Sequence, residues 1–231
     1  MQSKIIGTTM PVLELTLAPG ERIIAESDQL SWMAGDIALN TTTATAGGGG
    51  FLGVFSRVLG GGGLFMTEFS AGQGAAMVAF AAKIPGEIRA VPLTGGAVFL
   101  HRHGFLCGTE GLSVGVGFQQ TLGAGLFGGN GFILQKVEGQ GTAWVALGGE
   151  VVIYDLAPGQ ELLVHPGHVG MFTDGVGFEI TTVPGIRNMI FGGDGLFLAR
   201  LTGPGTVLLQ SMPMPNLAHA LEPYLPQPGN R

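Results

Sequence analysis

The chain has 231 residues and a net charge of −6; 11% of its residues are charged and 45% are hydrophobic. A chain of this size can bury a sizeable core, but an acidic sequence with 10 basic residues has little with which to neutralise phosphates, so nucleic acid is not an expected partner. The 43 glycines follow no strict Gly-X-Y period, which excludes collagen, and the apolar content excludes a disordered chain.

The N-terminal stretch MQSKIIGTTMPVLELTL has one lysine and then Gly, Pro and Glu14. It lacks an apolar segment followed by a small-residue cleavage site, so we expect no signal peptide. Cys107 is the single cysteine, which rules out an internal disulfide and is typical of a reducing compartment. These features predict a cytoplasmic protein.

The first recurring motif is a Pro-Gly turn followed by a β-rich run. LAPGERIIAESDQLSWM begins at Leu17, and LAPGQELLVHPGHVGMF begins at Leu156. A weaker copy, IPGEIRAVPLTGGAVFL, begins at Ile84. Pro-Gly is a turn dipeptide, so each copy predicts a turn that leads into a strand.

Residues 47–63, GGGGFLGVFSRVLGGGG, allow three interpretations: a phosphate-binding loop, a membrane-seeking segment or a joint between β elements. A phosphate-binding P-loop needs a lysine followed by Ser or Thr, and this stretch has only Arg57 as a basic residue. We therefore interpret it as a joint. Its apolar centre could form a short helix with one apolar face, either covering an end of the β core or contacting a partner. The residues of this predicted interaction segment are Phe51, Val54, Phe55 and Val58.

A glycine-rich turn and a hairpin recur three times along the chain. The turn ends at Gly63, Gly131 and Gly195, and the preceding residues are Gly62, Asn130 and Asp194. Gly, Asn and Asp tolerate a left-handed backbone best, so the position predicts a positive φ. An alternating strand, a GxG turn and a returning strand follow each copy, which is the pattern of a β-hairpin.

Together these repeats predict one all-β domain over residues 1–212, built from three units at about 10–80, 81–147 and 148–212. We expect the units to pack around a pseudo-threefold axis in a β-helix-like or β-prism-like arrangement. The tail, 213–231, includes NLAHALEPYL, which predicts a short helix capped by Asn216.

Several long motifs in order resemble the mitochondrial-biogenesis family named altered inheritance of mitochondria protein 24. They are LTLAPGERIIAESDQLSWM, GGGGLFMTEFSAGQG and FILQKVEGQGTAWVALGGEV, and the resemblance covers roughly residues 3–212. It implies an all-β fold similar to the tryptophan RNA-binding attenuator protein. It also implies a link to inner-membrane organisation and respiratory-complex integrity, as for the yeast member. It implies no catalytic residues.

The histidines suggest an alternative, a cupin-like metal-binding or small-molecule-binding protein. HRH places His101 and His103 on one face of a predicted strand, and a second pair, His165 and His168, lies in VHPGHVG. Gly95, five residues and His101-x-His103 match the beginning of a cupin metal motif, but the next acid, Glu110, is farther away than usual. A metal site requires these pairs to converge with a carboxylate. We expect hydrogen-bonded or surface histidines, and no metal or cofactor.

No catalytic constellation emerges from the remaining residues. Cys107 has no basic neighbour nearer than His103, and no G-x-S-x-G elbow is present. The glycine pattern GAGLFG at 123–128 has no βαβ context for a dinucleotide site. We therefore expect a non-enzymatic structural or interaction protein. Low charge and many β edges predict a homo-oligomer, a trimer before a dimer, with a protein or membrane surface as the further partner considered.

The repeated turn generates a stability prediction. Alanine at Gly63, Gly131 or Gly195 should lower the free energy of unfolding by on the order of 1 kcal/mol, because a Cβ is costly in a left-handed turn. Glycine at Asn130 or Asp194 should cost little and serves as the control. Thermal melts check this, and three alanine variants with unchanged melting temperatures would show that the turn assignment is wrong.

Overall fold

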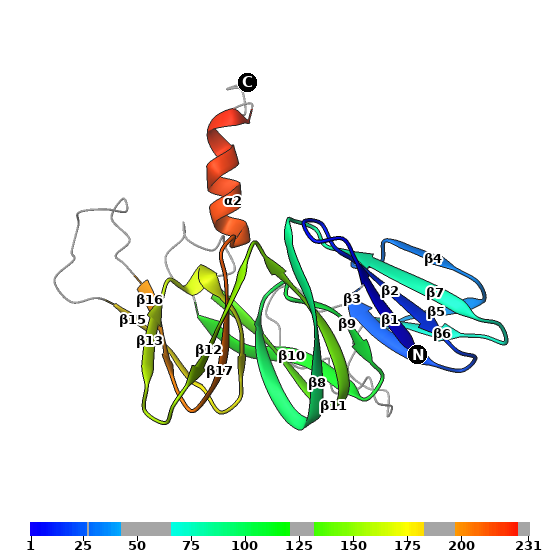
Figure 1. The fold of residues 1–231 in the computed structure, drawn as a ribbon, viewed down its shortest axis with the longest axis horizontal. Helices are drawn as coiled ribbons and strands as arrows, with labels where there is room; N and C mark the ends of the chain where they lie inside the picture. Colours follow the sequence, from blue (N-terminus) through cyan, green and yellow to red (C-terminus); the bar gives the residue numbers. More distant parts are fainter. Residues whose placement is uncertain (27, 43–65, 121–131, 183–196, 226–231) are drawn as a thin grey trace.

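The computed structural model describes residues 1–26, 28–42, 66–120, 132–182 and 197–225, and in this part the chain is mostly β-strand (Figure 1). The first unit contains β1 (Gln2–Ile6), β2 (Val12–Leu17), β3 (Arg22–Glu26), β4 (Trp32–Ala34), β5 (Ile37–Thr42), β6 (Met66–Ala71) and β7 (Ala76–Ala81). The second contains β8 (Gly86–His101), β9 (Phe105–Thr109), β10 (Leu112–Gln120) and β11 (Phe132–Gly148). The third contains β12 (Val151–Leu156), β13 (Glu161–Val164), η2 (Pro166–His168), β14 (Val169–Thr173), β15 (Gly177–Thr182), β16 (Phe197–Thr202) and β17 (Gly205–Gln210).

The same antiparallel pairings recur in the three units. In the first unit β2 and β4 pair with β7, while β3 and β5 pair with β6. In the third, β12 and β14 pair with β17, while β13 and β15 pair with β16. In the second unit the long strands β8 and β11 each take the place of two strands, and β9 and β10 flank β11.

Period-two alternation of apolar side chains explains why these segments form strands. In β2, Leu13, Leu15 and Leu17 are buried on one face. Leu13 lies opposite Phe80 of β7, and this cross-strand pair contributes to the first core. The alternation that the sequence shows is therefore the alternation that fills the core.

A glycine with positive φ lies at the equivalent turn of each unit: Gly20 at +80°, Gly95 at +103° and Gly159 at +76°. In the second unit this turn is inside β8, not at Pro85-Gly86, where the weaker sequence copy placed it. The strand there continues through the turn position, because β8 pairs with β11 on both sides of it. Because the strand is continuous here, the second copy of the Pro-Gly motif is the weakest of the three in the sequence.

Each unit also contributes a strand to the sheet of the next unit. β3 of the first unit pairs with β9 of the second, with Ala25 opposite Cys107. β8 of the second unit pairs with β14 of the third, with Leu100 opposite Met171. These two seams join the units into a continuous body with three hydrophobic cores.

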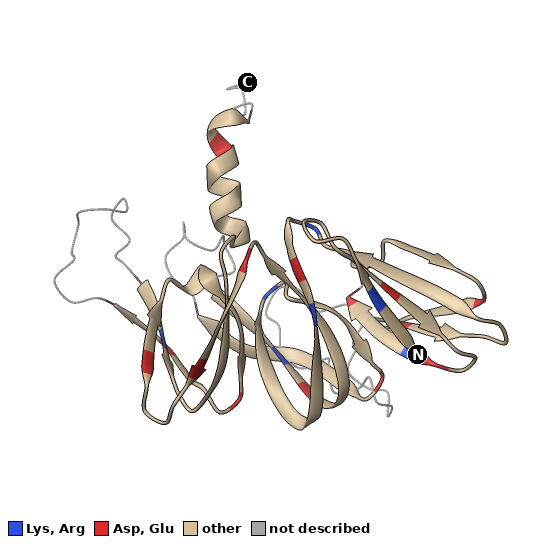
Figure 2. Cartoon of the chain, viewed as in Figure 1, with Lys and Arg blue, Asp and Glu red and all other residues tan. Residues whose placement is uncertain are grey.

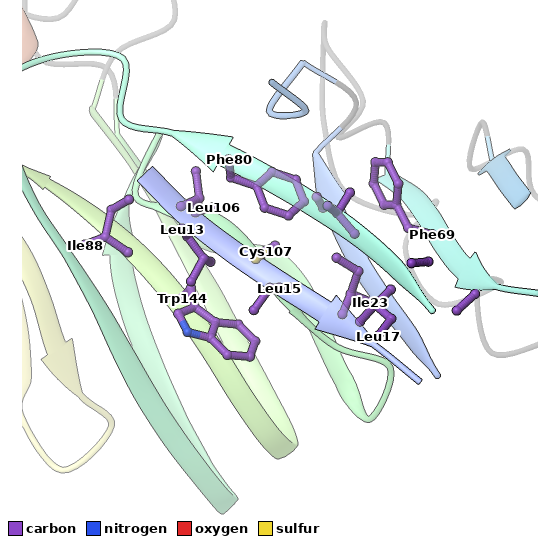
Figure 3. Packing of buried hydrophobic residues seen from close by; sticks show 14 of the residues in the cluster. Leu13, Leu15, Leu17, Ile23, Phe69, Phe80, Ile88, Leu106, Cys107 and Trp144 are labelled. Atoms are coloured by element: carbon purple, nitrogen blue, oxygen red, sulfur yellow. The ribbon is translucent and has the colours of Figure 1, made fainter. Parts of the chain in front are cut away.

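Side chains cross the seams into the neighbouring core. Ile24 of the first unit packs into the core built mainly by the second unit. Phe99 of the second unit packs into the third core, where its ring stacks on Phe172 with centroids 5.1 Å apart. In the opposite direction, Trp144 and Cys107 of the second unit pack into the first core (Figure 3).

The described strands form an open stack rather than a closed prism or barrel. The three units follow one another along the long axis of the molecule (Figure 1). No strand pairing among the described residues joins the third unit back to the first. Packing around a pseudo-threefold axis therefore stays a prediction.

The C-terminal helix differs in detail from the expected one. α2 spans Met214–Leu221 and is followed by η3 (Glu222–Tyr224). Pro213 is the N-cap, and no side chain caps the helix, so Asn216 lies inside the first turn instead of capping it. Pro215 lies in the first turn, where its φ suits a helix and no N–H partner is needed, so the helix can begin before Asn216. The helix projects away from the sheets and buries none of its residues (Figure 1).

Candidate functional site

The predicted interaction segment, Phe51, Val54, Phe55 and Val58, lies outside the described residues, as do the turns at Gly63, Gly131 and Gly195. The four histidines lie within them. Their surroundings, a pocket beside α2, and the free edges of β4 and β13 are the features considered for function.

His101 and His103 do not share a strand face, because β8 ends at His101 and His103 lies in the turn that follows. The His101 Nε2 donates a hydrogen bond to the Ala146 carbonyl oxygen at 3.2 Å. Burial lowers the pKa of His101 to about 4, so the ring is neutral at neutral pH. Burial also lowers the pKa of His103, and the neighbouring Arg102 charge adds to this effect.

His165 and His168 lie at the start and end of the short η2 turn, with ring centroids 5.8 Å apart. The His168 Nδ1 donates a hydrogen bond to the Gln210 carbonyl oxygen at 2.8 Å. Burial lowers the pKa of His165, with a further contribution from His168. His168 therefore ties the loop after β13 to the end of β17.

A small pocket at the base of α2 brings together side chains from all three units. Its cavity volume is about 50 Å³. A water needs on the order of 10–15 Å³ of such space, so the pocket has room for a few waters or one small ligand. The polar lining residues are Gln29, Lys83, His101, His103 and Gln210, and the apolar ones include Leu106, Leu147 and Met214.

The pocket has no metal-binding geometry. Among the described residues, no group of three or more His, Cys, Asp or Glu side chains is placed to hold a metal ion. His101 and His103 line the pocket, whereas His165 and His168 do not. The Asp28 carboxylate forms an ion pair with Lys83 Nζ at 2.6 Å. Nothing in this arrangement favours the cupin-like alternative.

Cys107 is fully buried in the first core, and burial raises the pKa of its thiol well above the usual value. A thiol that stays protonated is a poor nucleophile. Its position opposite Trp144 on β11 gives it a packing role.

A buried polar cluster at the first seam was not predicted from the sequence. The Glu26 carboxylate accepts a hydrogen bond from Gln135 Nε2 and a longer one, 3.5 Å, from Gln29 Nε2. All three side chains are buried, and Phe105 N–H donates to Gln135 Oε1 at 3.4 Å. Burial raises the pKa of Glu26, and the two glutamine hydrogen bonds partly offset this rise. The clue in the sequence was a glutamate at the end of an otherwise apolar strand run.

The two ends of the stack present free strand edges. β4 is the last strand of the sheet β1-β2-β7-β4, and β13 is the last strand of the sheet β13-β16-β15. Large apolar side chains on these strands are exposed, including Trp32, Met33 and Leu163. Exposed apolar edges of this kind are usually covered by another chain.

With this geometry established, comparison with known proteins identifies the family. A family model described as Mitochondrial biogenesis AIM24 matches residues 3–212. The chain belongs to this family. The comparison confirms the resemblance drawn from the LAPG motif and the glycine-rich turns, and it covers all three units.

The AIM24 fold of this chain is also found in a solved bacterial structure. Protein SPYM3_0169 from Streptococcus pyogenes superposes with a TM-score of 0.75 over 97% of this chain and 99% of that chain, at 22% sequence identity. No curated protein matched the chain. No helix among the described residues has the length and apolar character needed to cross a membrane. The comparisons thus establish family and fold.

The buried carboxylate generates a pH-dependent prediction. Because the folded-state pKa of Glu26 is raised, its contribution to stability is fully present below pH 4.5 and is lost as pH rises through the folded-state pKa. Glu26→Gln removes the buried charge and should therefore raise the free energy of unfolding more at pH 8 than at pH 4. Denaturant titrations at both pH values measure the difference. Glu150→Gln, at an exposed position, is the control, and an effect of Glu26→Gln that is equal at both pH values would contradict the assignment.

The lowered pKa of His101 leads us to expect the opposite pH dependence of stability. Its folded-state pKa is about 4 against an ordinary 6.5, so its contribution to stability is present above pH 6.5 and is lost as pH falls toward 4. In His101→Gln the loss of stability on lowering the pH should be smaller, because an amide can donate a hydrogen bond to the Ala146 carbonyl without titrating. The difference between variant and wild-type unfolding curves, measured from pH 7 to pH 4, isolates this effect from that of Glu26.

Proposed function

We propose that this AIM24-family chain is a non-enzymatic structural protein that acts by assembling head to tail with copies of itself. The observation that carries the proposal is that two seams of the same kind, β3 with β9 and β8 with β14, join neighbouring units, while the strands in the equivalent places at the ends of the stack, β13 and β4, have no such partner among the described residues. The proposed location is cytoplasmic, and any link to membranes or respiratory complexes would come from partners that bind the assembly.

One ten-stranded sheet shows how neighbouring units join. Along it, β12-β17-β14 of the third unit continues into β8-β11 of the second, and β8-β11-β9 continues into β3-β6-β5 of the first, while β10 pairs with β11. The remaining strands form two separate sheets, β1-β2-β7-β4 in the first unit and β13-β16-β15 in the third. Pairing of β13 in one copy with β4 in the next would join these two sheets in the same way.

Both seams within the chain predict one register for this pairing. Ala25 lies opposite Cys107 in the first seam, and Leu100 lies opposite Met171 in the second. In the repeat, Val164 occupies the place of Ala25 and Leu100, and Trp32 occupies the place of Cys107 and Met171. Either pair therefore places Val164 of one copy opposite Trp32 of the next. Leu163 then lies opposite Met33. The agreement of the two transfers supports this register.

Burial of equivalent residues supports the same interface. Ile24 and Phe99 occupy one position of the repeat, and each packs into the core of the following unit. Leu163 occupies that position in the third unit, which has no following unit, and it is 53% exposed where Ile24 is 2% exposed. A following unit from another copy would bury Leu163 as the second unit buries Ile24.

Charge does not oppose such an assembly. Figure 2 shows few charged residues, scattered over the strands rather than gathered in one basic or acidic patch. A head-to-tail contact is heterologous, so it forms either a closed ring or an open filament. We propose the ring, with three copies as the expected size.

The proposal predicts that the protein is a stable oligomer and that Leu163→Asp dissociates it. A carboxylate at Leu163 would be desolvated without a partner in the joined sheet, which costs several kcal/mol. Light scattering after size-exclusion chromatography at micromolar concentration measures the mass. Leu39→Asp on β5 is the matched control, because Leu39 is 45% exposed and β5 belongs to a different sheet from β4 and β13. A wild-type protein that stays monomeric would overturn the proposal.

A further inference from the structure

We propose that Trp32 is the anchor of the head-to-tail interface and that its indole covers Val152 and Tyr154 of the neighbouring copy. This inference rests on the proposed assembly and deepens it, because it assigns the side chain that most of the contact depends on. It is drawn from the way in which Trp144 closes the first core inside the chain.

Inside the chain, a tryptophan from one unit closes the core of the unit before it. Trp144 on β11 of the second unit is 3% exposed and belongs to the core of the first unit. Figure 3 shows its indole beside Leu13 and Leu15 of β2. Both leucines are 0% exposed, so the second unit completes their burial.

Trp32 lies at the place in the first unit where a unit covers the one before it. Cys107 and Trp144 are cross-strand partners in the second unit, and Met171 and Leu208 are the equivalent partners in the third. Both pairs pack into the core of the preceding unit. The equivalent pair in the first unit is Trp32 and Ala79.

The first unit thus holds the same two kinds of side chain as the second, in exchanged places. In the second unit the tryptophan is on the β11 position and the small residue is on β9; in the first unit the tryptophan is on β4 and the small residue is on β7. Cross-strand partners are immediate neighbours on one face of a sheet, so either arrangement presents one indole to the unit before it. In the single chain no unit precedes the first, and Trp32 is 46% exposed.

The surface that would receive this indole is present at the other end of the chain. The repeats VLELTLAPG and VVIYDLAPG place Val152 and Tyr154 where the first unit has Leu13 and Leu15. Val152 is 47% exposed and Tyr154 is 43% exposed, in contrast to the two fully buried leucines. Among the described residues the third core therefore lacks the cover that Trp144 gives the first. Trp32 of a second copy supplies it in the register that the two inner seams predict.

Tryptophan fluorescence tests this directly, because Trp32 and Trp144 are the two tryptophans of the chain. Trp144→Phe leaves Trp32 as the sole reporter. Its emission should shift to shorter wavelength as the protein is concentrated through the assembly transition, since burial removes the indole from water. Trp32→Phe, which leaves the buried Trp144, should show no such shift and is the control.

Substitution tests whether Trp32 anchors the contact. Trp32→Ala should raise the dissociation constant of the assembly by about thirtyfold or more, as truncation of a central interface tryptophan does. The double variant Trp32→Cys with Ala79→Trp rebuilds the arrangement of the second unit and should restore assembly. Circular dichroism and thermal melts of the dissociated chains show whether each variant is folded.

The outcomes separate the two proposals. A folded wild-type protein that never assembles overturns both. An assembly in which Trp32 keeps the emission of an exposed indole, or in which Trp32→Ala leaves the dissociation constant unchanged, overturns the anchor while the assembly stands. Should the double variant misfold, the fluorescence shift of Trp144→Phe still decides the question.

Discussion

The interaction on which this structure depends is the pairing of strand edges between neighbouring units. β3 finds its second partner in β9 and β8 finds one in β14, so each unit is completed by the next. The same dependence joins the cores, because Ile24, Phe99 and Trp144 each pack into the core of a neighbouring unit. A fold of this type leaves unsatisfied edges wherever the series stops.

This dependence explains the chain's composition. With 11% charged residues, the sequence is suited to surfaces that face other units rather than water. Exposed apolar residues lie on β4 and β13, which have free edges, and β12 exposes Val152 and Tyr154. The proposed assembly needs a complementary head and tail, and the exposed Trp32 at one end and the exposed Val152 and Tyr154 at the other are the residues assigned to that contact.

Buried polar side chains also lie at the seams. Glu26 ends the strand that forms the first seam, and its carboxylate is buried with Gln135 and Gln29. In the repeat, His101 and His165 occupy the place of Glu26. His101 is kept neutral by burial and bonds to the Ala146 carbonyl. One position thus carries a carboxylic acid or an imidazole; Glu26 bonds across the first seam to Gln135, whereas His101 bonds within its own unit.

The sequence by itself determined the local elements and the family. Period-two alternation, Pro-Gly turns and glycine-rich turns are local signals, so the all-β fold and its recurring hairpins could be predicted from residues such as Leu13, Leu15 and Gly20. The sequence could not locate the turn of the second unit, because β8 continues through the position of that turn. It placed His101 and His103 on one strand face, whereas the strand ends between them. The Glu26 cluster, the pocket beside α2, and the contrast between buried Trp144 and exposed Trp32 were decided by tertiary structure alone. Each depends on contacts between units far apart in sequence, and local periodicity carries no information about which unit covers which.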